Sequence, residues 1–140
     1  MRNKIGASIA AVSIAVMFSA VPALAQCQIP SLGVQMQNPS GSPFALMLKT
    51  EPAKIKIGQK LTAHVFVCAG DKANVERFSV DAMMPEHKHG MNYTPKIINK
   101  DNRRYSAHGL LFHMPGLWRL EAAFRADGKM HRFFREFTIE

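Results

Sequence analysis

The chain has 140 residues, which suits one domain, and its 18 lysines and arginines outnumber its 10 aspartates and glutamates, for a formal net charge of +8. The basic residues are scattered without a run of five like charges or a nucleic-acid-binding motif, so we expect no nucleic-acid partner. The excess positive charge leaves two interpretations open. It is either a solvated basic face or a surface for weak contact with an anionic membrane or an acidic partner.

The first 25 residues have the pattern of an export signal. Two positive charges precede an apolar run of 14 residues, and Ala23 and Ala25 form the small-x-small pattern that signal peptidases read. The run is shorter than the roughly 20 residues that a helix needs to span a bilayer. We therefore predict a signal peptide over residues 1–25, cleaved after Ala25, and a periplasmic mature protein. An uncleaved anchor is the alternative.

The chain contains two cysteines, Cys27 and Cys68, and neither belongs to a C-x-x-C pair, so the sequence offers no redox motif. In an oxidising compartment the simplest prediction is a disulfide between them, which would tie the N-terminal segment to a strand end. The alternative is a buried thiol at Cys68 and a mobile one at Cys27.

Beyond the export signal, the chain shows β-type rather than helical periodicity. Residues 26–43 are rich in Pro, Ser, Gly and Gln, which predicts an irregular lead-in. Residues 44–140 then hold short strand-like runs bounded by turn residues, at 44–50, 61–68, 75–83, 95–99, 103–112, 117–125 and 129–140. About seven such runs predict an all-β fold, a single immunoglobulin-like antiparallel β-sandwich.

Alternation along these runs assigns residues to the two faces of a strand. In residues 117–125, one face carries Trp118, Leu120, Ala122 and Phe124. Met84 has the parity of other apolar residues in its run and is expected in the core, whereas Met83 points the other way.

One short stretch, "DAMMPEHKHGMNYTP" at residues 81–95, gathers histidine and methionine beside a proline turn. His87, His89 and Met91 are two residues apart, so their side chains share a face if the segment is extended. Imidazole nitrogen and thioether sulfur favour copper, Cu(I) in particular, over magnesium, calcium or manganese. Zinc more usually recruits cysteine, histidine or a carboxylate, and only Glu86 is near.

A second patch, "LLFHMPGLW", places His113 and Met114 at a strand end. The loops of a sandwich cluster at its two ends, so this patch completes a four-ligand site if it lies at the same end as residues 85–93. The competing interpretation is that these histidines and methionines are loop and packing residues. Among the other histidines, His64 is expected to be structural, and His108 and His131 are expected on strand surfaces.

The stretch "MPEHKHGM" followed by "YSAHGLLFHMPGLWRLE" resembles the YtkA-like domain family, also called FixH-like. Its pattern is Met-Pro-x-His-Gly-His-Gly-Met, then a tyrosine-containing strand, then Phe-x-Met-Pro-Gly-x-Trp. The matching residues are Met84, Pro85, His87, His89, Gly90, Met91, Tyr105, Phe112, Met114, Pro115, Gly116 and Trp118. Lys88 departs from the pattern, because the family usually has glycine there; lysine adopts a positive φ only at a cost, and its charge disfavours a bound cation.

The resemblance covers roughly residues 44–139 and implies a small exported or membrane-attached β-sandwich. The family is associated with respiratory or copper-related proteins of the bacterial envelope and has no established catalytic activity.

The leading hypothesis is a periplasmic protein that binds copper or hands it to a partner. His87, His89 and Met91 are its main predicted ligands, and His113 and Met114 complete the set. The alternative is a metal-free accessory domain that docks on an envelope, respiratory complex. We expect no enzyme, because the serine and histidine residues do not form a nucleophile–base pair with an orienting carboxylate. The sequence leaves the oligomeric state open.

Overall fold

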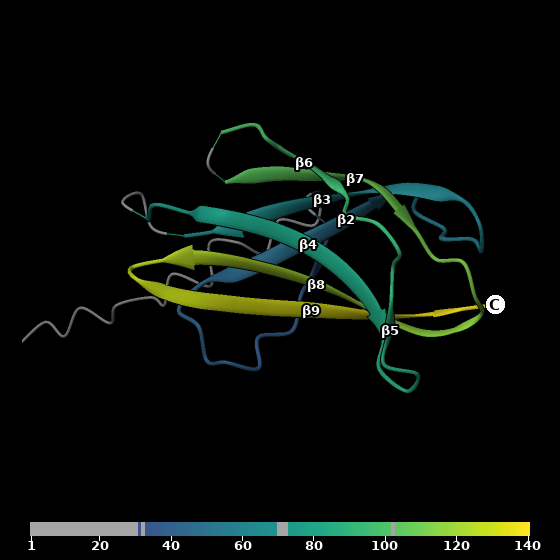
Figure 1. The fold of residues 1–140 in the computed structure, drawn as a ribbon. Helices are drawn as coiled ribbons and strands as arrows, with labels where there is room; N and C mark the ends of the chain where they lie inside the picture. Colours follow the sequence, from purple (N-terminus) through teal and green to yellow (C-terminus); the bar gives the residue numbers. More distant parts are fainter. Residues whose placement is uncertain (1–30, 32, 70–72, 102) are drawn as a thin grey trace, which may run out of the picture.

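The computed structural model describes residue 31 and residues 33–69, 73–101 and 103–140. Within these ranges the chain is all-β, with two antiparallel sheets that face each other as a sandwich (Figure 1), so the predicted fold class is confirmed. No helix in the described part of the chain is long and apolar enough to cross a membrane. The export signal and Cys27 lie outside these ranges, so the signal cleavage, the periplasmic location and the disulfide stay predictions.

Seven strands contain four residues or more, and each of their bounds lies within one residue of the sequence prediction. They are β2 (Ala45–Glu51), β3 (Lys60–Cys68), β4 (Glu76–Met84), β6 (Lys96–Asn99), β7 (Arg104–Leu111), β8 (Gly116–Ala126) and β9 (Lys129–Ile139). Two strands of two residues each, β1 (Val34–Gln35) and β5 (His89–Gly90), complete the set. One sheet has the order β1-β2-β3-β7-β6 and the other β5-β4-β8-β9.

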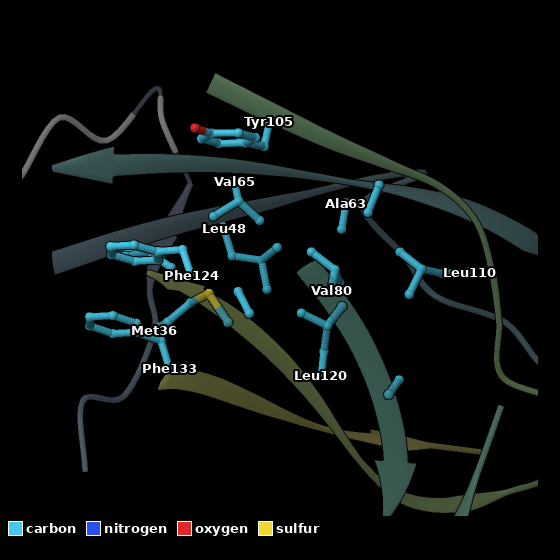
Figure 2. Packing of buried hydrophobic residues seen from close by; sticks show 14 of the residues in the cluster. Met36, Leu48, Ala63, Val65, Val80, Tyr105, Leu110, Leu120, Phe124 and Phe133 are labelled. Carbon is cyan, nitrogen blue, oxygen red and sulfur yellow. The ribbon is translucent and has the colours of Figure 1, made fainter. Parts of the chain in front are cut away.

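A single hydrophobic core fills the space between the sheets. The alternation predicted for β8 is confirmed, because all four residues of its predicted apolar face are 0% exposed: Trp118, Leu120, Ala122 and Phe124. Figure 2 shows side chains of both sheets, among them Val65 and Leu120, pointing into this common interior. Fully burying one large apolar side chain contributes about 1.5–3 kcal/mol, so this alternation is the main reason why the chain folds as a sandwich.

The lead-in is more ordered than its composition predicts. Residues 34–37 run from the edge of one sheet to the edge of the other and bond to both: the Met36 amide donates to the Leu46 carbonyl at 2.8 Å, and the Gln37 amide donates to the Phe134 carbonyl at 2.8 Å. Met36 is 2% exposed and belongs to the core. The irregular lead-in predicted for residues 26–43 is therefore wrong for this part, because backbone pairing with two distant strands overrides local composition.

His131 was expected on a strand surface, and this expectation is wrong. The residue is 7% exposed, and its ring lies 4.8 Å from the Phe44 ring and 5.4 Å from the Phe124 ring. Its Nε2 lies 3.3 Å from the Ala126 carbonyl oxygen, so Nε2–H donates and Nδ1 accepts from the Ser42 hydroxyl at 2.8 Å. Both ring nitrogens are thus satisfied, as a buried polar side chain requires.

Candidate metal-binding site

The two segments that the sequence singles out lie at the same end of the sandwich. The turn between β4 and β5 and the loop between β7 and β8 both reach the end at which the C-terminus lies, on the right in Figure 1. Their closest contact joins the Nε2 atoms of His89 and His113, which are 2.9 Å apart, with the two rings at 81° to each other. The two loops therefore meet through imidazole nitrogens, which is the arrangement that a shared metal site requires.

His89 is positioned by the pairing of β4 with β5. Met84 lies opposite His89 in this ladder, and the Met91 amide donates to the Ala82 carbonyl at 3.1 Å. Residues directly opposite in an antiparallel pair present their side chains on the same face of the sheet. Because Met84 is 2% exposed and faces the interior, His89 also points inward, and it is half-buried.

The segment from His87 to Met91 is not one continuous extended strand. Residues 85–88 form a turn, and Lys88 has a φ of +49°, in the left-handed region, which glycine adopts at no steric cost. His87 is exposed on this turn, and among the contacts of the described residues none joins it to His89 or His113. The expectation that three side chains converge because of their spacing therefore does not extend across the turn to His87.

His113 is positioned by the loop between β7 and β8, which is held at several points. The Trp118 indole N–H donates to the Met114 carbonyl at 2.9 Å, and the His113 and Trp118 rings meet edge to face at 5.4 Å. On the other side of the loop, the Gly58 amide donates to the Phe112 carbonyl at 2.9 Å. Trp118 and Phe112 are both 0% exposed, so a rigid part of the core fixes the imidazole of His113.

Three methionines belong to the segments that carry the histidine pair or to the strand beside them. Met91 and Met114 are half-buried and pack against the core cluster. Met84 is buried beneath the loop, since a Cβ built on Gly116 would lie 2.9 Å from the Met84 Cε. The sequence interpretation assigned Met84 to the core alone. Its place opposite His89 makes it a further candidate ligand, and its position in the His/Met motif was the signal that could have indicated this role.

The donor set fits a soft metal better than a hard one. Two imidazole nitrogens that bind one ion at about 2.0–2.1 Å lie at most about 4 Å apart, so the His89–His113 separation is within reach of a shared ion. Without a metal, the same contact is a hydrogen bond in which one ring must donate and the other accept. The described residues include no group of three or more His, Cys, Asp or Glu side chains that could hold a metal. Thioether sulfur is a further ligand type that suits a soft ion.

A second group of histidines lies on the outer face of the five-stranded sheet. The His64 Nδ1 lies 3.3 Å from the Ser106 hydroxyl, and its Nε2 lies 3.2 Å from a Glu51 carboxylate oxygen. The His108 Nδ1 lies 3.3 Å from the Thr62 hydroxyl. These contacts join neighbouring strands, as expected for structural histidines.

Local surroundings shift the pKa of two tyrosines and one aspartate. Burial raises the pKa of Tyr93, and burial followed by the nearby Asp101 charge raises the pKa of Tyr105. A hydrogen bond from Arg104 lowers the pKa of Asp101, which lies at the turn between β6 and β7.

No family model, curated protein or solved structure matches this chain. Membership of the YtkA-like family therefore stays a prediction from two motifs, and the functional argument depends on the geometry of the site.

Proposed function

We propose that the protein binds copper, preferentially Cu(I), through His89 and His113 at one end of the β-sandwich. The observation that carries this proposal is the 2.9 Å approach of their Nε2 atoms, which come from two loops separated by 24 residues in the chain. Each imidazole is fixed by a different part of the fold, one by strand pairing and the other by Trp118. Because the two nitrogens are already held close together, the site needs little rearrangement to accept an ion.

Thioether sulfur completes the ligand set in this proposal. Met91 and Met114 are the sulfur ligands expected from the sequence, and both lie half-buried beside the core at this end of the sandwich. Histidine together with methionine favours Cu(I) over hard cations. His87, exposed on the preceding turn, is placed to meet an ion that enters or leaves rather than to hold it in the interior.

The role that follows is binding and transfer in the periplasm, without catalysis. A site at a loop-bearing end, with neutral ligands, can pass its ion to a copper acceptor or take it from a donor. The alternative, a metal-free accessory domain of an envelope complex, would make the His89–His113 contact a structural hydrogen bond between two loops.

The experiment is a competition between the mature protein and a Cu(I) chelator under reducing conditions. We expect about one copper per protein, lost in the double variant His89→Asn/His113→Asn. The matched control is His64→Asn/His108→Asn, which removes two imidazoles from the outer sheet face and should leave the copper stoichiometry unchanged. Equal losses in both variants, or complete loss of copper from the wild type to a weak chelator, would refute the proposal.

A further inference from the structure

The two sheets of the sandwich differ in how their charges are balanced. The part of the chain that forms β1, β2, β3, β6 and β7, with the connections inside this sheet, carries eight lysines and arginines against two carboxylates. The part that forms β4, β5, β8 and β9, with its turns and the C-terminal residue, carries seven side chains of each sign. Among the described residues, the whole excess of positive charge therefore belongs to the five-stranded sheet.

The outer face of the four-stranded sheet is neutralised by ion pairs between its strands. Arg119 donates to Glu136 at 2.7 Å, and Arg132 donates to Glu121 at 2.6 Å. Each pair joins a cation and a carboxylate of neighbouring strands, β8 and β9. This face consequently offers little net charge to a partner.

The five-stranded sheet retains unpaired positive charge. Its two carboxylates are engaged locally, since Asp101 pairs with Arg104, and Glu51 contacts His64 at 3.2 Å. Lys54 and Lys56 lie at the end of the sheet, in a groove that Glu140 also lines, and we do not count them with the outer face. Four exposed lysines on or beside the outer strands then have no ion pair with another described residue: Lys49, Lys60, Lys96 and Lys100.

A hollow of about 150 Å³ opens on this outer face. Lys49 lies opposite His64, and His64 lies opposite Ser106, so their side chains share the face and line the hollow together. Lys100 and Arg104 line it as well, and no carboxylate of the described residues does. Ammonium, guanidinium and hydroxyl groups all donate hydrogen bonds, so the hollow is suited to an anionic group such as a phosphate.

The rest of the face indicates a lipid surface rather than a protein partner. Its central side chains are polar, namely Thr62, His64, Ser106 and His108, and the exposed apolar residue Ile98 lies on the edge strand β6. A stable protein interface has an apolar or aromatic centre. An anionic membrane instead attracts basic side chains that are spread over a surface. Unpaired lysines around a polar centre therefore match the headgroup layer of a membrane.

We propose that the outer face of the five-stranded sheet docks on an anionic phospholipid membrane, with one headgroup phosphate held in the hollow between Lys49 and Lys100. The unpaired lysines provide attraction over the whole face, and the hollow provides one defined contact. The proposal does not rest on the proposed copper function. His89 and His113 lie at an end of the sandwich rather than on this face, so docking leaves them uncovered.

The test measures how much of the mature protein sediments with lipid vesicles. One set of vesicles is pure phosphatidylcholine, and the other is an equal mixture of phosphatidylcholine and phosphatidylglycerol. We expect binding only to the anionic vesicles, and weaker binding as sodium chloride increases. Lys49→Gln/Lys100→Gln should weaken this binding about tenfold. The matched control is Arg125→Gln/Lys129→Gln, which makes the same change in net charge at exposed residues of the other sheet and should weaken it less than about twofold.

Inorganic phosphate distinguishes the possible sources of the anionic group. We expect it to displace the protein from anionic vesicles at a lower ionic strength than chloride does, because it competes for the hollow. Equal binding to both kinds of vesicle, an equal effect of the two double variants, or tighter binding to polyglutamate than to anionic vesicles would overturn the proposal. Saturable phosphate binding without any binding to vesicles would also overturn it, since the hollow would then serve a free phosphate compound.

Discussion

The turn before the histidine pair makes a sharp prediction about Lys88. Its φ of +49° places a residue with a Cβ in the left-handed region, at the position where the resembling family has glycine. This conformation costs a non-glycine residue about 1–2 kcal/mol. Glycine avoids that cost but gains about 0.4–1 kcal/mol of freedom in the unfolded chain. The difference predicts that Lys88→Gly raises the free energy of unfolding by about 0.5–1 kcal/mol.

The assay is reversible denaturation by urea, followed by fluorescence of the single tryptophan, Trp118, which is fully buried. For a domain of this size the gain corresponds to a rise in Tm of about 2–5 °C. The control is Lys54→Gly, the same replacement at an exposed position that lacks a positive φ, where only the unfolded chain gains freedom and stability should fall. If both variants lose stability equally, the turn is not held in the left-handed conformation, and the break between His87 and His89 that follows from it is wrong.

Three further predictions concern the core and the titrating groups. Met84→Ala should cost about 2–5 kcal/mol of stability in urea denaturation, because the side chain is 2% exposed and its loss leaves a cavity. Met84→Leu should cost less than about 1.5 kcal/mol, and equal costs of the two variants would contradict this packing. Ser42→Ala should cost about 1–3 kcal/mol by the same assay, since it removes the hydroxyl partner of buried His131; a neutral effect would contradict the observed hydrogen bond. Tyr105, which is 4% exposed and whose pKa burial raises above the ordinary 10.0, should ionise later in the folded protein than in urea by ultraviolet absorbance. The unfolded chain loses this proton first, so stability should fall as the pH rises above 10, and coincident titrations would contradict the burial.

Much of the fold could be predicted because half-buried strands alternate with a period of two. The alternation from Trp118 to Phe124 depends only on neighbouring residues, so it predicts both the strand and which of its faces is buried. Residues 34–37 were missed because their order comes from bonds to two strands far away in the chain. His131 was missed although a local signal existed, since it shares parity with Phe133, which is 0% exposed.

The candidate site could be predicted only in part. The residue types around His89 and His113 are visible in the sequence, but whether their loops lie at the same end depends on strand order and register. The spacing of His87 suggested a third converging ligand. The positive φ of Lys88 turns the chain between His87 and His89. Pro85, and the glycine that the resembling family has in place of Lys88, were the local signs of that turn.

The most direct test of the central claim is a Cu(I) titration followed through the histidine ring signals by NMR. Cu(I) is diamagnetic, so each ring can be observed with the ion bound. The account predicts that the Nε2 signals of His89 and His113 shift together and saturate at about one equivalent, while those of His64, His108 and His131 stay unchanged. Shifts confined to the outer-face histidines, or no ring shift at one equivalent, would contradict it.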